Sequence, residues 1–239
     1  MRVVKLFGRR PRRSDSARPG ARRSPSDAVN RVDLEELTPD LLSYLGQAAY
    51  LQLVIFETLG RAVATAPSIA SKEAMSRVAG LSLAKHHGLT AEIVRQGAEP
   101  GPTMQPYVAA IDNYVRITAG ADWYETLVTS YITSGLLNDF ARQLAGGLPA
   151  DASARITALL GADDGHEIIV AELRSAIEAN PRLASRLALW GRRLVGDTLL
   201  AARSALAANG HPDEARLEPV FTELIAAHTR RMDAIGLTA

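Results

Sequence analysis

The stretch LLSYLGQAAYLQLVIFETLGRAVAT, residues 41–65, decides the fold class of this chain. It is apolar or small on nearly every face of a helix, and Glu57 is its only acidic residue. Just before it, Thr38 is a good cap residue and Pro39 suits the first position of a helix. We expect a helix that begins there and lies deep in a bundle, because a helix that is apolar all round must be covered all round.

The composition extends this expectation to the whole chain. The 239 residues are 47% apolar and only 5% aromatic. Runs of Val, Ile, Thr and Tyr between turn residues are missing, so we predict an all-α protein rather than a β-sandwich or barrel. The chain has no Cys, which excludes disulfides, a thiolate nucleophile and an iron–sulfur cluster. Any metal must therefore be held by His and carboxylate side chains.

Further helices follow from capping signals and from apolar residues spaced three and four apart. Asp122 and Glu125 have the spacing of a capping box, which predicts a helix start at Asp122. Gly161 and Gly165 interrupt one segment, where a break, a bulge or a close helix contact would justify them. The expected helical segments are 39–65, 68–97, 104–118, 122–145, 151–179, 181–207 and 213–237. Residues 100–102 are expected to interrupt the helical structure.

Charge is divided between a basic N-terminal segment and an acidic remainder. Residues 1–31 hold ten basic and two acidic residues, a net charge of +8, while the rest carries −7. Because residues 8–26 mix Arg with Pro, Gly and Ser, we expect a disordered tail before a helical domain at 32–239. Clustered guanidinium groups favour binding to nucleic acid, and the alternative is a solubilising extension. The candidate nucleic-acid-binding residues are Arg9, Arg10, Arg12, Arg13, Arg22 and Arg23.

A second set of residues matches part of a metal centre. In four-helix bundles that bind two metal ions, two helices each supply an acid and the other two each supply an acid-x-x-His pair, since side chains three residues apart share a helix face. This chain has one acid-x-x-His pair. It also has one histidine on the inward-facing side of a second helix and one acid on each of two other helices. The candidate ligands are Glu57, His86, Asp139, Asp163 and His166.

The set lacks one acid, and its members have ordinary structural alternatives. Three residues before His86 the chain has Leu83 instead of an acid. Glu57 and His86 would alternatively pair with each other across the core, since a buried carboxylate needs a partner. Asp163 would alternatively cap a helix that restarts nearby, with His166 in its first turn.

Several stretches carry a family resemblance. The two most specific are LALWGRRLVGD (187–197) and HTRRMDAIGL (228–237), and similar ones are YLQLVIFETLGRAVATAP (50–67), DWYETLVTSYITSGLLNDF (122–140) and DDGHEIIVAEL (163–173). Over about residues 33–239 the chain resembles the ferritin-like proteins grouped with tRNA isopentenyladenosine hydroxylase. The resemblance implies a ferritin-like four-helix bundle with two additional C-terminal helices. For the hydroxylase itself it implies a non-haem di-iron centre that activates dioxygen to hydroxylate the prenyl group of a modified tRNA adenosine.

Carried over residue by residue, the resemblance gives roles to the candidate ligands. Glu57 matches the acid of the first helix, His86 the histidine of the second, and the 163–166 pair the ligands of the fourth. Asp139 substitutes for an acid that relatives carry near Ser134. The sequence departs from the pattern at Leu83, where a Glu is expected. Loss of a bridging carboxylate weakens a site for hard ferrous ions, so the cofactor is either a di-iron centre or none.

Two functions of different classes follow. The first is a non-haem di-iron or mono-iron tRNA hydroxylase, with the Arg-rich tail delivering the RNA. The second is a metal-free ferritin-like interaction module that binds nucleic acid or a protein or ribonucleoprotein partner through the tail and Arg192–Arg193. We expect a cytoplasmic protein without a membrane partner, because a long apolar run and a secretory signal are missing. The apolar first helix would suit a homodimer.

Overall fold

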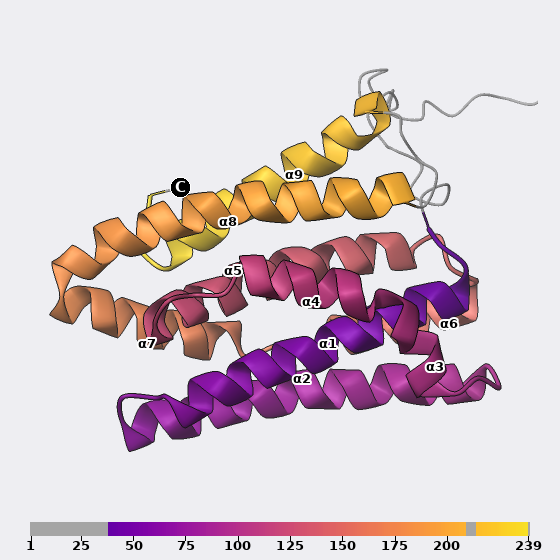
Figure 1. The fold of residues 1–239 in the computed structure, drawn as a ribbon, viewed down its shortest axis with the longest axis horizontal. Helices are drawn as coiled ribbons and strands as arrows, with labels where there is room; N and C mark the ends of the chain where they lie inside the picture. The colour runs from indigo at the N-terminus through magenta and orange to yellow at the C-terminus, as the bar shows by residue number, and fades with distance from the viewer. Residues whose placement is uncertain (1–37, 209–213, 239) are drawn as a thin grey trace, which may run out of the picture. The chain divides into compact units, whose positions relative to one another are not determined.

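The computed structural model describes residues 38–208 and 214–238, and within these ranges the chain forms helices and no strand (Figure 1). The predicted all-α fold is confirmed there. The predicted tail at 1–31 and the helix start at Asp213 lie outside the described residues. The helices are α1 (Leu41–Ala64), α2 (Ile69–Arg95), α3 (Pro100–Met104), the 3-10 helix η3 (Gln105–Tyr107), α4 (Val108–Ile117), α5 (Trp123–Ala145), α6 (Ala150–Leu160), α7 (His166–Ala179), α8 (Pro181–Ala208) and α9 (Glu214–Ala234).

A four-helix bundle carries the predicted site residues. Helices α1 and α2 pack side by side along most of their length, α5 packs against α1, and α7 packs against α2 and α5 (Figure 1). Helix α6 also contacts α2 and α5, so α6 and α7 together take the place of a fourth helix. The interruption between them spans residues 161–165, and it is the break that the two glycines predict.

Two additional C-terminal helices pack onto this bundle, as predicted. Helix α8 contacts α5 and α7, and α9 contacts α5 and α8. Gly191 of α8 lies against Met232 of α9 so closely that a Cβ atom on the glycine would collide with the methionine side chain. These two residues belong to the two most specific stretches of the sequence, LALWGRRLVGD and HTRRMDAIGL. Both stretches therefore contribute to the contact between the added helices.

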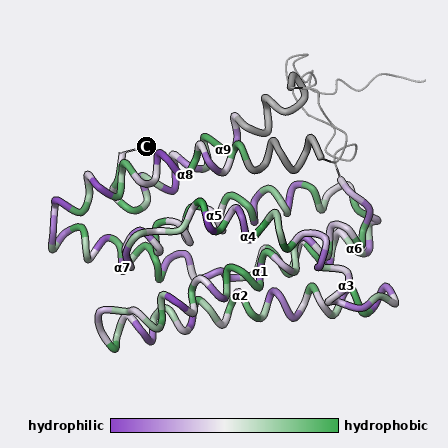
Figure 2. The backbone as a smooth tube through the Cα atoms, viewed as in Figure 1, coloured by the Kyte–Doolittle hydropathy of each residue, from purple (hydrophilic) through white to green (hydrophobic). Residues whose placement is uncertain are grey.

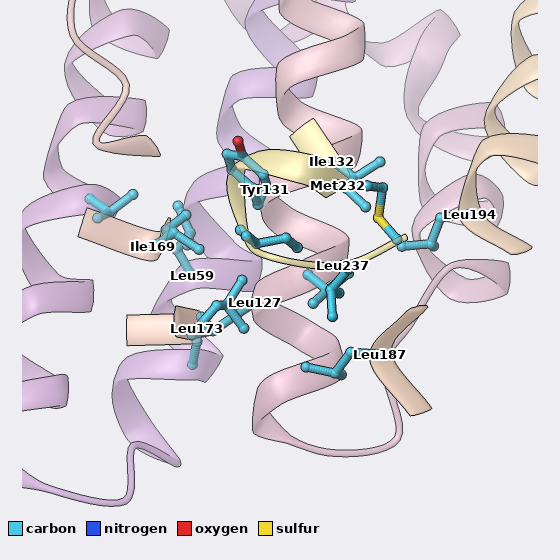
Figure 3. Packing of buried hydrophobic residues seen from close by; sticks show 14 of the residues in the cluster. Leu59, Leu127, Tyr131, Ile132, Ile169, Leu173, Leu187, Leu194, Met232 and Leu237 are labelled. Atoms are coloured by element: carbon cyan, nitrogen blue, oxygen red, sulfur yellow. The ribbon is translucent and has the colours of Figure 1, made fainter. Parts of the chain in front are cut away.

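The core consists of two clusters of buried apolar side chains. Hydrophobic and hydrophilic residues are interspersed along the coloured parts of the helices, as amphipathic packing requires (Figure 2). The larger cluster joins residues of α1, α2, α5, α7, α8 and α9, including Leu59, Leu127 and Leu173 (Figure 3). The smaller one joins α1, α2 and α6 to the C-terminal end of α5. Each fully buried leucine contributes about 1.5–3 kcal/mol, so these contacts set the relative positions of the helices that carry the site.

The predicted start of the first helix and the predicted break at 100–102 are wrong, whereas the predicted starts at Asp122 and Pro181 are confirmed. Helix α1 has Asp40 as its N-cap, whose carboxylate accepts the Ser43 N–H at 3.0 Å, while the Thr38 hydroxyl donates to a carbonyl of α5. The hydrogen bonds with Ser43 lower the pKa of Asp40. Helix α3 begins at Pro100, where the sequence predicts a break, because proline also suits a first helical turn. Asp122 caps α5 as predicted, accepting the N–H three residues on at 2.9 Å.

No helix in the described part of the chain is both long and apolar enough to cross a lipid bilayer.

Candidate functional site

The structure places the first two predicted ligands apart from each other. Glu57 lies on α1 with its side chain exposed. His86 lies on α2, half-buried, and its Nδ1 atom is 2.9 Å from the carbonyl oxygen of Ala49 on α1. This nitrogen therefore carries the proton and donates to the carbonyl. The alternative pairing of Glu57 with His86 across the core is wrong, because α1 turns the glutamate towards solvent.

Asp139 on α5 is paired with an arginine. Its Oδ2 atom accepts a hydrogen bond from Nη2 of Arg231 on α9 at 2.6 Å, and the Arg231 side chain is only 15% exposed. Gly135 makes room for this arginine, since a Cβ atom there would collide with the guanidinium group. An acid that the sequence assigns to a metal is thus neutralised by a side chain of the C-terminal helix.

The predicted acid-x-x-His pair lies at the break between α6 and α7. Asp163 is exposed, and its carboxylate accepts the N–H of Gly165 at 2.9 Å. Gly165 has a φ of 69°, the left-handed conformation that glycine adopts most readily. Asp164 accepts the backbone N–H of His166 at 3.2 Å, and α7 begins at that histidine. The predicted cap at Asp163 is wrong, because Gly165 is the N-cap of α7 and no side chain caps this helix, whereas the placement of His166 in the first turn is right.

His166 occupies the inner end of this turn. Its Nδ1 atom is 3.1 Å from a carboxylate oxygen of Asp164, and its Nε2 atom is 3.2 Å from the hydroxyl of Ser134 on α5. The ring of Tyr131 meets it edge to face, with centroids 5.2 Å apart. Burial lowers the pKa of His166, with the Asp164 carboxylate opposing this and the cations of Arg231 and Lys85 adding to it. The imidazole is therefore held in its neutral form.

Lys85 is the residue of this region that the sequence analysis misses. It lies on α2 and is only 3% exposed, and its ammonium group donates to the carbonyl of Leu160, the last residue of α6, at 3.3 Å. Burial lowers the pKa of Lys85, opposed by the carboxylates of Asp164 and Asp163. The negative end of the α6 dipole also favours a cation at this position. The sequence does contain a signal for the burial of Lys85, because it lies between Ser82 and Leu89, at steps of three and four residues, on a buried face of α2.

A neutral amide pair lies elsewhere in the bundle interior. Gln52 of α1 is 2% exposed and donates to the side-chain oxygen of Asn138 on α5 at 2.7 Å. Across the described residues, no three His, Asp or Glu side chains form a group that would hold a metal ion. The structure therefore does not bring the five predicted ligands together.

The family model described as "Ferritin-like domain, actinomycetes" matches residues 35–211, which extend from just before α1 to just past α8. The chain belongs to this ferritin-like family. A search of curated proteins finds no match. The family match agrees with the predicted ferritin-like bundle and concerns the fold.

A di-iron centre does not fit the residues of this ferritin-like chain. Two cations, Lys85 and Arg231, act electrostatically on His166, and Arg231 also holds Asp139. A dication roughly 6 Å from one such charge would be repelled by about 5 kcal/mol at an effective dielectric constant of 20. The carboxylates that would offset this repulsion are exposed or occupied by backbone N–H groups and arginine.

The six arginines predicted to bind nucleic acid lie between residues 9 and 23, outside the described residues. Arg192 and Arg193, the second basic element of that prediction, are exposed on α8. Arg193 is bound to its own helix, lying 3.5 Å from an Asp197 carboxylate oxygen and stacking over Trp190 at 5.2 Å. Arg192 donates to the carbonyl of Thr238 at 3.0 Å. Both guanidinium groups keep further N–H donors that face solvent.

Proposed function

We propose that this ferritin-like chain is a metal-free binding module whose basic N-terminal segment, residues 1–31, binds RNA. The observation that carries the metal-free part is the presence of Lys85 and Arg231 among the predicted ligands. These side chains supply the positive charge that iron ions would bring to a catalytic bundle. The net charge of +8 on residues 1–31 supports the RNA-binding part, because clustered arginines release the counterions of phosphate groups.

RNA binding is tested with the full-length chain by fluorescence anisotropy of labelled single-stranded RNA at several salt concentrations. The test variant changes the tail arginines at positions 9, 10, 12, 13, 22 and 23 to Gln. Each phosphate contact adds about 0.7 to the slope of log affinity against log salt, so the loss of six flattens the slope by about 4. A control with half as many substitutions changes three exposed arginines of the body, Arg77, Arg116 and Arg182, to Gln.

The outcomes separate two kinds of partner. Loss of salt-sensitive RNA binding in the tail variant alone supports the proposal. Equal binding by the tail variant and the wild type would contradict the proposal. The face of α8 that carries Arg192 would then be the candidate RNA contact. If neither chain binds RNA and the tail instead binds a protein, the proposed RNA partner is wrong. Only the assignment as an interaction module is then retained.

The second candidate function is the tRNA hydroxylase. It is favoured by the sequence resemblance over residues 33–239 and by the pairing of a histidine with an adjacent carboxylate at the start of α7. Iron analysis of the purified chain, before and after anaerobic addition of ferrous ions, decides between the two. We expect far less than one iron per chain. Near-stoichiometric iron that is lost in both His86→Ala and His166→Ala would replace the metal-free proposal with the hydroxylase.

A further inference from the structure

A cavity of about 460 Å³ lies between α1, α4 and α5, and its lining includes neither His166 nor Lys85. Its inner wall is buried and includes Val54 and Ala62 of α1. At its outer end the lining residues Arg61 and Asp122 are exposed, so the cavity opens to solvent there. Cavities of 300–1,000 Å³ with mostly apolar walls and a few polar groups are typical small-molecule sites.

The polar groups of the inner wall are bonded to the protein, with one exception. The hydroxyls of Thr129 and Thr133 donate to backbone carbonyls at 3.1 and 2.7 Å, and the Tyr114 hydroxyl is 2.8 Å from that of Thr198. Ser130 is 5% exposed, and its hydroxyl has no hydrogen-bond partner among the described residues. A wall whose polar atoms are otherwise satisfied presents an apolar surface, which suits the hydrocarbon part of a ligand.

The outer end of the cavity carries an uncompensated positive charge. Asp122 is paired with Arg186 at 2.5 Å. Arg61, in the last turn of α1, donates from Nη2 to the Thr58 hydroxyl at 3.1 Å, and no carboxylate of the described residues pairs with it. Four of its five N–H donors are therefore available to a ligand. An arginine presents these donors in a planar fork that matches the two oxygens of a carboxylate.

We propose that this cavity binds a small carboxylic acid with an apolar body, the carboxylate at Arg61 and the hydrocarbon against Val54, Ala62 and Val115. A cavity of 150 Å³ holds one benzene molecule, so this one has room for roughly 15 to 18 non-hydrogen atoms. That size corresponds to a medium-chain fatty acid or an aromatic acid of two rings.

The test compares decanoate with decanol on the full-length chain by isothermal titration calorimetry, below the critical micelle concentration of decanoate and the solubility limit of decanol. A charge-assisted hydrogen bond makes decanoate bind about tenfold or more tightly than decanol. Arg61→Gln abolishes this preference and leaves decanol unaffected. The matched control, Arg77→Gln, changes an exposed arginine of α2 that does not line the cavity and leaves both affinities unchanged.

A second variant tests the location. Ser130→Leu fills the inner end of the cavity without removing a hydrogen bond, so it weakens both decanoate and decanol by at least tenfold. If this variant does not fold, Val115→Phe on the α4 wall serves the same purpose. The proposal is refuted if decanoate binds no more tightly than decanol, if Arg61→Gln leaves the preference intact, or if filling the cavity leaves both affinities unchanged.

Discussion

Replacing Lys85 by Met is expected to stabilise this protein. The lysine is 3% exposed, and its single hydrogen bond among the described residues, to the Leu160 carbonyl, is long at 3.3 Å. Burial lowers its pKa, which means that the folded state disfavours the charged form. A methionine of similar length would fill the same space without a charge, since its flexible thioether adapts to irregular cavities.

The magnitude follows from two opposing contributions. Desolvation of a buried ion costs several kcal/mol, and the carboxylates of Asp164 and Asp163 offset this only in part, because burial still lowers the pKa of Lys85. Loss of the hydrogen bond to Leu160 costs about 1 kcal/mol. A net gain of about 1–2 kcal/mol raises the Tm of a domain of this size by about 2–8 °C.

The pH dependence has a definite sign. Because the folded pKa of Lys85 lies below its ordinary value of 10.5, the unfolded chain binds more protons in the window between the two values. Wild-type stability therefore rises with pH through this window. The advantage of Lys85→Met is complete below the folded pKa and shrinks as the pH approaches 10.5.

Urea unfolding followed by circular dichroism at pH 7 and pH 9.5 measures both effects. The control is Lys72→Met, an exposed lysine on the same helix, which should change stability by less than about 0.5 kcal/mol. A Lys85→Met variant that is less stable than wild type by more than 1 kcal/mol at pH 7 would refute the reasoning. It would mean that the attraction of the Lys85 ammonium group to the two aspartates and to the C-terminal end of α6 exceeds its desolvation cost.

Three further predictions concern the same interior. Burial lowers the pKa of His166, so the unfolded chain binds protons more readily and the free energy of unfolding falls as the pH drops below about 6.5. His166→Gln is expected to weaken this pH dependence, as measured by urea unfolding between pH 5 and 7. Gly135→Ala lowers the free energy of unfolding by about 1–3 kcal/mol, because the new methyl group displaces the Arg231 guanidinium. Gly80→Ala raises it by about 0.4–1 kcal/mol, because a Cβ atom at position 80 would meet no neighbour. Thermal unfolding compares the two variants. Asn138→Leu costs about 1–3 kcal/mol by leaving Gln52 unpaired, and adding Gln52→Leu recovers part of this in a double-mutant cycle.

The sequence predicts the helices of this fold well because their signals are local. The cap at Asp122, the break near Gly165 and the apolar repeat of α1 and α2 each act within a few residues, and the structure has helices with nearly these bounds. Where two local signals compete, the prediction fails. Thr38 and Asp40 are both good caps, and only the tertiary contact of Thr38 with α5 decides between them.

The candidate site is harder to predict, because it depends on the rotation of each helix about its axis. Helix α1 is apolar on nearly every face, so its pattern does not reveal that Glu57 points to solvent while Gln52 points inward. On α2 the neighbours Lys85 and His86 are about 100° apart, and both lie near the packed face. Arg231 is 92 residues away from the Asp139 that it neutralises, and no periodicity links the two.

Arg231 connects the C-terminal stretch HTRRMDAIGL to the interior of the bundle. It reaches Asp139 across α5 only because residue 135 is a glycine. Removal of one partner from a half-buried pair leaves the other charge without compensation, so α9 satisfies a charge in α5 as well as covering apolar surface. Arg231 supplies this compensation from within the chain, so the Asp139 carboxylate needs no bound cation to balance its charge.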